Sequence, residues 1–404
     1  MKSTEATPST LSIRAEPFEG GRRLLLAGAV AGVLGLGATI AAFFLSPPRA
    51  LAGYLVGYMY WLGIALGSIG WLCAFHAAKA RWVVVVRRLL EHTGAAVAVF
   101  VLLFVPIAVG MKQLYVWVAP TASLGHEMLG HLEHQRPYLN PGFFLARAAF
   151  YFAGWIALSY LLRGWSVKQD DTGAVGLTAR QRTLGAPGLL LHALLVTFAS
   201  FDWMMSLHPE WGSTIFGLYV ISGNVLAAMA LWILVVVLCE RGGILVGLLQ
   251  PSHYHSLGKF LLAFVCFWAY IAFSQFMLIW IANLPEEIPW YLLRMKGSWG
   301  RVGLGLIVGH FVLPFFVLLS QNLKRQPLRL ALVAVWILAV HYVDLYWLVI
   351  PRFSPASALP HWSDLTSWVG VGGIGLCYAV WLARGRALVP ARDPYLGESM
   401  RYSK

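Results

Sequence analysis

Long apolar segments separated by short polar ones dominate the chain. Ten of them approach the roughly 20 residues that an α-helix, rising about 1.5 Å per residue, needs to cross a bilayer. They lie at Leu24–Leu45, Leu51–Ala77, Ala95–Met111, Phe143–Leu162, Pro187–Leu207, Thr214–Leu238, Leu257–Asn283, Val302–Ser320, Leu328–Ile350 and Leu365–Ala383. The pattern predicts an all-α polytopic membrane protein. Its single transmembrane domain covers residues 24–383, between an N-terminal segment (1–23) and a C-terminal tail (384–404).

The composition supports this class and excludes others. Hydrophobic residues make up 59% of the 404 residues, charged residues 12%, and the mean hydropathy is +0.69. Because soluble domains carry roughly 25% charged residues, this chain has too little polar surface for a soluble enzyme or a disordered protein. The net charge of +13 is spread between the apolar segments without a long basic run, which argues against nucleic-acid binding.

Lys and Arg are divided unequally between the two alternating sets of connecting segments. The set with both termini holds 22 of the 30, and the other set holds Arg49, Lys112, Arg136, Arg147, Arg294, Lys296, Arg301 and Arg352. Because positively charged segments stay in the cytoplasm, we expect both termini on the cytoplasmic side of the membrane. The first apolar segment is longer than a signal-peptide core, so we expect a retained helix.

Carboxylates and histidines inside predicted spans are costly and therefore informative. Asp202 lies in the fifth span, where we interpret it as a proton acceptor or a quinone-facing carboxylate. An interfacial or helix-capping carboxylate near Trp211 is the alternative. His341 and Asp344 share one face of the ninth span and form a natural proton-relay pair. A polar pair that merely joins helices is the alternative there.

Further polar residues lie at several depths of the predicted spans. His310, Asn224 and Lys259 join the candidate proton pathway, although Lys259 could simply extend its ammonium group to the membrane surface. Tyr270 and Gln275 join Asp202 as candidates to lie near a quinone. A proton path from the inner side through His310 to His341, Asp344 and Asp202 is geometrically allowed, but the sequence does not show that these residues meet.

The longest predicted outer loop is rich in histidine and glutamate, which raises the question of a metal. His126, Glu127, His131, Glu133 and His134 lack the H-E-x-x-H spacing of zinc proteases. We therefore expect a solvated helix that docks partner subunits rather than a zinc site.

Histidines in the spans also raise the question of haem. His76, His192, His310 and His341 show no doubled pair at fixed spacing, as a cytochrome b bundle needs. No C-x-x-C motif occurs among the four cysteines, so we interpret these as packing residues. We expect no redox cofactor bound by this chain.

DWMMSL at 202–207 and FSQFMLIW at 273–280 are specific for a membrane sequence, and they are parts of a larger set of runs that carry a family resemblance. The runs of this set are YLNPGFF at 138–144, FDWMMSLHPEWGSTIFG at 201–217, LGK at 257–259, WAYIAFSQFMLIW at 268–280, NLPEE at 283–287 and PFFVLLS at 314–320, followed by Lys324 and Arg325. In these runs the chain resembles the ActF-type membrane subunit of alternative complex III, and the resemblance covers roughly residues 50–350. That complex is a bacterial quinol:cytochrome c, or electron carrier, oxidoreductase.

The resemblance implies an NrfD-like (polysulfide-reductase-like) fold, with two four-helix bundles and flanking helices. It implies a cofactor-free subunit beside a homologous quinol-binding subunit, an iron–sulfur subunit and cytochrome c subunits, in contact with lipids. Haems and iron–sulfur clusters would belong to the partners. This subunit would contribute a proton path or a surface near a quinone such as menaquinone. Asp202 lies in the best-matched run; His310, His341 and Asp344 are carried over mainly by their depth.

Two other functions remain open from the sequence. A structural scaffold of the same complex would use its polar residues only to join helices. A polytopic transporter would need a matched pair of interrupted helices around a midplane cavity, and the sequence shows no such pair.

Overall fold

The computed structural model describes residues 17–120 and 124–403, without the side chain of Glu127. Most of the predicted N-terminal segment, residues 1–16, lies outside the described residues, as do residues 121–123 and 404. The described residues form helices and irregular connections with no strand, and ten of their helical segments are long and apolar enough to cross a membrane. The all-α polytopic prediction is confirmed.

The ten spans occur in chain order. They are α1 (Arg22–Leu45), α2 (Pro47–Ala77), the run of α3 (Val84–Ala95), η1 (Ala96–Val99), α4 (Phe100–Leu103) and α5 (Val105–Val109), then α8 (Pro141–Thr172), α9 (Gly176–Trp203) with η3 (Met205–Leu207), α10 (Phe216–Arg241), α11 (Pro251–Ala282), the run of α13 (Gly297–Leu306), η4 (Ile307–Val312) and α14 (Leu313–Leu319), α16 (Pro327–Val349) with η5 (Ile350–Arg352), and α17 (Trp362–Ala383). Short helices between or after the spans are α6 (Met111–Leu114), α7 (Gly125–Gln135), α12 (Ile288–Met295), α15 (Gln321–Arg325) and α18 (Leu396–Met400).

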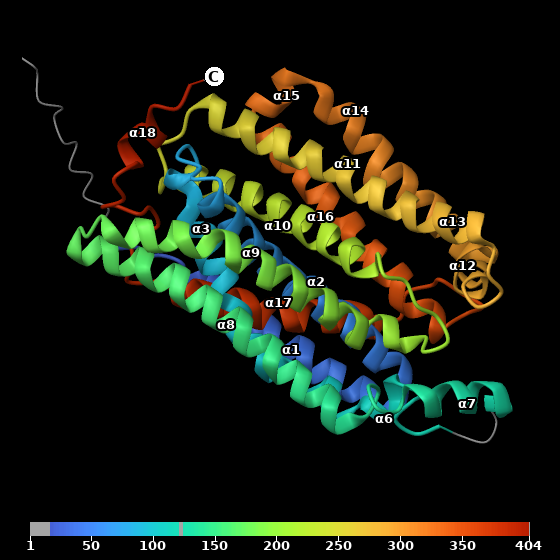
Figure 1. Cartoon of the computed structure of the whole chain (residues 1–404). Helices are drawn as coiled ribbons and strands as arrows, with labels where there is room; N and C mark the ends of the chain where they lie inside the picture. The colour runs from blue at the N-terminus through green and yellow to red at the C-terminus, as the bar shows by residue number, and fades with distance from the viewer. Residues whose placement is uncertain (1–16, 121–123, 404) are drawn as a thin grey trace, which may run out of the picture.

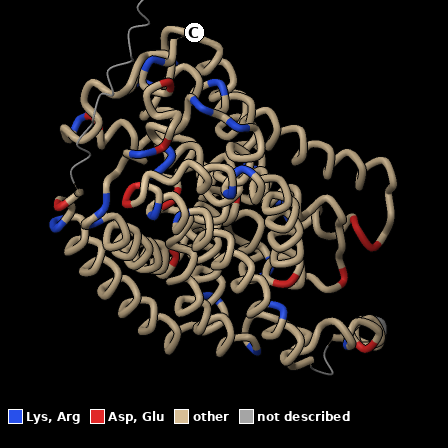
Figure 2. Tube along the Cα trace, turned by 60° about the vertical axis from the view of Figure 1, so that its left-hand side comes forward, with Lys and Arg blue, Asp and Glu red and all other residues tan. Residues whose placement is uncertain are grey.

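The long helices run side by side and give the molecule two ends (Figure 1). One end, here the terminal end, carries α15, α18 and the turn between α8 and α9; the opposite, distal end carries α6, α7 and α12. In Figure 2 the long helices are mostly uncharged, and many Lys and Arg residues gather near the C-terminus. The side of a membrane that each end faces stays a prediction.

The fourth and fifth spans are longer than predicted. Their helices were expected to end at Leu162 and to begin at Pro187, but α8 continues to Thr172 and α9 begins at Gly176. Gly173, with φ of 67°, closes α8 in the left-handed conformation that glycine adopts readily. The polar residues of this hairpin are therefore helical extensions of the spans, which hydropathy alone cannot distinguish from a loop.

The third span also begins earlier than the predicted Ala95, because its charged first turns are neutralised inside the protein. Glu91 pairs with Arg87 (Nε–Oε1, 3.0 Å) and Arg88 (Nε–Oε2, 2.9 Å). Arg87 also pairs with Asp393 of the C-terminal tail, and Arg88 with Asp170 of α8. This buried network fastens α3 to α8 and to the tail at the terminal end.

Small residues determine how the first and last spans pack. Gly28, Gly32 and Gly35 of α1 face Gly370 and Gly373 of α17, so the two backbones come into direct contact. A Cβ atom on Gly35 would lie 2.6 Å from the Cα of Gly370. In a membrane there is no hydrophobic driving force between helices, because the lipid is itself apolar. Close packing at small residues then holds the helices together.

We predict that Gly35→Leu separates α1 from α17. The leucine has no space at the crossing, and overpacking costs roughly 1–3 kcal/mol. Thermal unfolding of the purified protein in mild detergent, followed by tryptophan fluorescence, should show a lower midpoint. Gly37→Leu is the matched control, because no atom lies within 4 Å of a Cβ built there. Equal midpoints for the two variants would contradict this account of the packing.

Candidate functional site

Asp344 is a buried carboxylate held by neutral donors. It projects from α16 and accepts the Tyr219 hydroxyl of α10 (2.6 Å) and the Trp268 indole N–H of α11 (3.1 Å). Its exposed fraction is 1%, and no ion pair within the described residues involves it. A buried carboxyl group without a cation can exchange a proton with a neighbouring group, whereas an ion-paired one is held in its charged form.

Two histidines lie beside this carboxylate. His341 precedes it by about one turn of α16, and the His310 ring lies 6.0 Å from the His341 ring, between centroids. His310 also packs on Trp268, with centroids 4.1 Å apart. None of the four ring nitrogens has a hydrogen-bond partner in the described part of the chain. Buried polar atoms of this kind are usually satisfied by water or by a ligand.

His310 lies in an irregular part of the eighth span. Residues Ile307–Val312 form the π-helical stretch η4, between α13 and α14. Such single-turn π insertions occur frequently at functional sites, because the extra residue redirects side chains. Here the insertion accompanies the inward position of His310, which has no exposed surface.

A cavity of about 520 Å³ adjoins this group, enclosed by α10, α11, α12, α13 and α16. Tyr219 and Trp268 form part of its wall, so Asp344 lies one side chain behind the cavity. Most other lining residues are aromatic or aliphatic. Among them, Phe273, Leu304 and Ile307 are more than half exposed, so the cavity is open on the side that these residues border.

Arg294 is the cationic group of this cavity. It projects from α12, has no exposed surface, and packs its guanidinium 3.6 Å from the centre of the Trp290 ring. Its N–H groups donate to the carbonyls of Trp347 (3.1 Å) and Leu348 (2.6 Å), and no described carboxylate pairs with it. Burial lowers the pKa of Arg294 to about 9. A buried cation without a counter-ion favours a ligand that presents oxygen atoms.

The sequence-predicted residues take different places around this site. Gln275 is buried and donates to the Tyr291 hydroxyl (3.3 Å), which lines the cavity. Tyr270 lies on the exposed outer face of α11 and does not line the cavity. Lys259 is exposed near the terminal end of the same helix, so the structure does not bring it to Asp344.

Asn224 belongs to a line of buried polar groups that follows α2. Its Oδ1 lies against Gly63 of α2, and the neighbouring Gly223 lies against the His341 ring. Farther toward the terminal end, His192 of α9 lies beside Gly70 of α2.

The line continues to the start of α9. Gly185 packs against the backbone of α2 at His76, and Gln181 follows one turn nearer the terminal end. In the described residues, Gln181, His76, His192 and Asn224 each retain a buried side-chain atom without a hydrogen-bond partner. These residues and His341 form what we call the α2 seam.

Asp202 lies in a different environment. It forms a two-point ion pair with Arg147 of α8 (2.8 and 2.9 Å) and accepts the Tyr151 hydroxyl (2.7 Å). Arg147 in turn stacks on Tyr138 and Phe143. The Asp202 carboxylate is therefore neutralised between α8 and α9, and the side-chain hydrogen bonds of Asp202 do not lead to His341 or Asp344.

The histidine-rich outer segment forms the helix α7 at the distal end. His131 contacts the Pro209 carbonyl (2.9 Å), and Glu133 pairs with Arg136 at the surface. The side chain of Glu127 lies outside the described residues. Among the described residues, no three His, Cys, Asp or Glu side chains are grouped closely enough to hold a metal ion.

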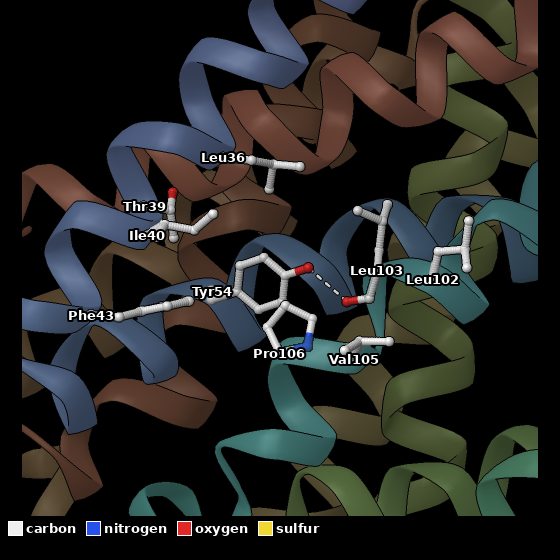
Figure 3. A pocket seen from close by; sticks show the side chains of 9 residues that line it. All are labelled: Leu36, Thr39, Ile40, Phe43, Tyr54, Leu102, Leu103, Val105 and Pro106. Atoms are coloured by element: carbon white, nitrogen blue, oxygen red, sulfur yellow. Dashed lines mark hydrogen bonds between the residues drawn. The ribbon is translucent and has the colours of Figure 1, made fainter.

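A second hollow, of about 260 Å³, lies between α1, α2 and the third span (Figure 3). Its lining is aliphatic and aromatic except for the hydroxyls of Thr39 and Tyr54. Tyr54 donates to the Leu103 carbonyl (2.6 Å), as Figure 3 shows. With no ionisable group other than this bonded phenol, the hollow offers no acid–base chemistry.

Sequence reasoning missed Arg294, Tyr219 and Trp268 as site residues. Arg294 was counted only as an outer-loop charge, although Trp290, Tyr291 and Arg294 lie on one face of a short helix and could have signalled burial. Tyr219 and Trp268 carried no signal beyond their types, because only the packing of α10 and α11 on α16 brings them to Asp344.

We predict that Asp202→Asn lowers stability. Removing one partner of a buried ion pair leaves Arg147 uncompensated, at a cost of roughly 3–5 kcal/mol. The yield and melting temperature of the purified protein should both fall. Glu133→Gln, in an exposed pair, should change neither. A stable Asp202→Asn protein that loses only activity would assign Asp202 a chemical role instead.

Comparisons with known proteins add no identification. No family model matches the chain, and no curated protein matches it at a significant level.

Proposed function

We propose that this chain is a membrane subunit of a quinol-oxidising respiratory complex, of the ActF type of alternative complex III. In this proposal the cavity beside Asp344 receives the headgroup of a quinol such as menaquinol, and Asp344 takes up a proton that the quinol releases. The chain binds no redox cofactor. It works beside a homologous quinol-binding subunit, an iron–sulfur subunit and cytochrome c subunits in a bacterial inner membrane.

One observation carries the proposal: a buried guanidinium lines the cavity, a buried carboxylate lies one side chain behind its wall, and the two do not form an ion pair. Asp344 lies behind its wall and Arg294 lies in its lining. Uncompensated groups of opposite charge are costly inside a membrane protein and mark functional sites there. The aromatic lining and the open side of the cavity suit a flat ring with a long apolar tail.

Different side chains would contact different parts of a bound quinol. Arg294 and Tyr291 would position the ring oxygens, and the apolar walls would hold the ring and exclude water. Oxidation of one quinol releases two protons and two electrons. We assign the electrons to haem and iron–sulfur centres of partner subunits. The protons leave one at a time, with Tyr219 as the hydroxyl between the cavity and the Asp344 carboxylate.

His341 and His310 would carry the proton onward from Asp344. Each neutral imidazole can accept a proton at one of its unpartnered ring nitrogens and release a proton from the other. The α2 seam extends from His341 toward the terminal end and would complete a path of exchangeable groups across the protein. Asn224 belongs to this path; Asp202, neutralised by Arg147, does not.

A structural scaffold within the same complex is the second candidate. The Arg147–Asp202 pair and the network around Glu91 favour it, since both join helices without leaving a reactive group free. The scaffold predicts that replacing Asp344 has no effect on turnover. The two candidates therefore differ in one measurable quantity.

We predict that Asp344→Asn lowers quinol:acceptor activity of the assembled complex by at least tenfold. Asparagine keeps an acceptor for Tyr219 but cannot take up a proton, so the loss should fall on kcat. The measurement is steady-state turnover with a short-chain quinol, together with subunit composition of the purified complex. Glu286→Gln, in an exposed loop, is the control. Normal turnover of an assembled Asp344→Asn complex would favour the scaffold.

We predict that Arg294→Gln raises the KM for quinol about tenfold with a smaller effect on kcat. A lost charge-assisted hydrogen bond is worth roughly 1.5 kcal/mol, which corresponds to that factor. Arg301→Gln, an exposed arginine of the neighbouring α13, should leave KM unchanged. An unchanged KM in Arg294→Gln would show that the headgroup does not bind in this cavity, even if turnover still required Asp344.

A further inference from the structure

A cluster of basic side chains lies at the terminal end, where α15 forms the elbow between the eighth and ninth spans. We call it the elbow cluster; it consists of His255 and Lys259 of α11 with Lys324 and Arg325 of α15. The start of α11 packs directly against α15 (Figure 1). The aliphatic stem of Lys324 lies across Gly258, where a Cβ atom would come within 2.7 Å of its Cγ.

Within the elbow cluster, Lys259 and Lys324 carry like charges and have no described carboxylate partner. Lys324 is about nine-tenths buried, with an exposed fraction of 6%. No ion pair in the described part of the chain involves Lys259 or Lys324. Burial and the charge of Lys259 both lower the pKa of Lys324. The Nδ1 atom of His255 is also buried without a partner there.

Three arginines at the same end have carboxylate partners within the fold. Arg87 and Arg88 share Glu91, and Arg81 pairs with Glu398. Within the described residues, these three arginines have carboxylate partners, and Lys259 and Lys324 have none. Such mutual repulsion costs free energy, which an external anion would recover.

The position of the cluster indicates the kind of anion. The eighth span ends at Leu319 and the ninth begins at Pro327, so α15 lies where the apolar spans meet the polar end. Phe316 and Leu319 before the elbow, and Leu328 and Leu332 after it, are exposed apolar side chains. Phosphate-binding cations beside exposed apolar helices suit a molecule with a charged head and acyl chains.

We propose that the elbow cluster binds the phosphate headgroup of an anionic phospholipid. Lys259 and Lys324 contact the phosphodiester oxygens, and the acyl chains lie along the exposed faces of α14 and α16. The site is separate from the cavity beside Asp344 and does not depend on the proposed quinol chemistry. It would fix the elbow between the eighth and ninth spans.

The test uses the full-length protein in its complex, purified in mild detergent and supplied with phosphatidylglycerol or phosphatidylcholine. Native mass spectrometry counts the retained lipids, and a titration gives the affinity. We expect selective retention of phosphatidylglycerol by the wild type. The affinity of Lys259→Gln/Lys324→Gln should be roughly 30-fold lower, which corresponds to about 1 kcal/mol for each cation removed.

Controls keep the test decisive. Lys296→Gln/Arg301→Gln removes two exposed cations from the distal end and should leave retention unchanged. Lys259→Gln alone should lower the affinity for phosphatidylglycerol roughly fivefold, and it should leave folding intact because the position is exposed. Equal retention of both lipids, or a single variant that binds like the wild type, would overturn the proposal. So would displacement of phosphatidylglycerol by millimolar inorganic phosphate, which would identify a simple anion site.

Discussion

The near-complete burial of α2 is the constraint on which the rest of the structure depends. In the most apolar stretch of α2, 94% of the residues are buried, and the helix contacts α3, α9, α10, α16 and α17. Glycines on α2 and on its neighbours make these close contacts, because a side chain there would collide with backbone or with Asn224. The same close packing places the α2 seam at the centre of the molecule. In our proposal, structural and proton-handling roles therefore share one helix.

The treatment of buried charge separates two kinds of residue. Asp202, Glu91 and their arginine partners are neutralised within the fold, and such groups mainly hold helices in register. Asp344, Arg294 and Lys324 lack a described counter-ion although each is about nine-tenths buried or more. Lipid and protein interior both penalise isolated charge. At these three residues, a bound ligand or a proton transfer would therefore lower the free-energy cost of burial.

Part of the candidate site could be predicted from the sequence. His341 and Asp344 were recognised because their spacing on one helix is a local property, and His310 by its depth in a span. Arg294 was missed because a charge in a connecting segment resembles a topology signal. Tyr270 was placed near a quinone, but the structure puts it on the outer face of α11. Its helical face depends on how α11 is rotated against its neighbours, which hydropathy does not report.

The sequence by itself determined the class of protein and the number of spans, and it pointed to His310, His341 and Asp344, which the structure brings together. Lipid requires long apolar helices, and that requirement is readable residue by residue. Only the tertiary structure decided which buried charges are paired. Asp202 meets Arg147 across two helices, whereas Asp344 meets only a tyrosine and a tryptophan. Ion pairing between helices depends on their rotation and depth, and these are set by side-chain packing summed over the whole bundle.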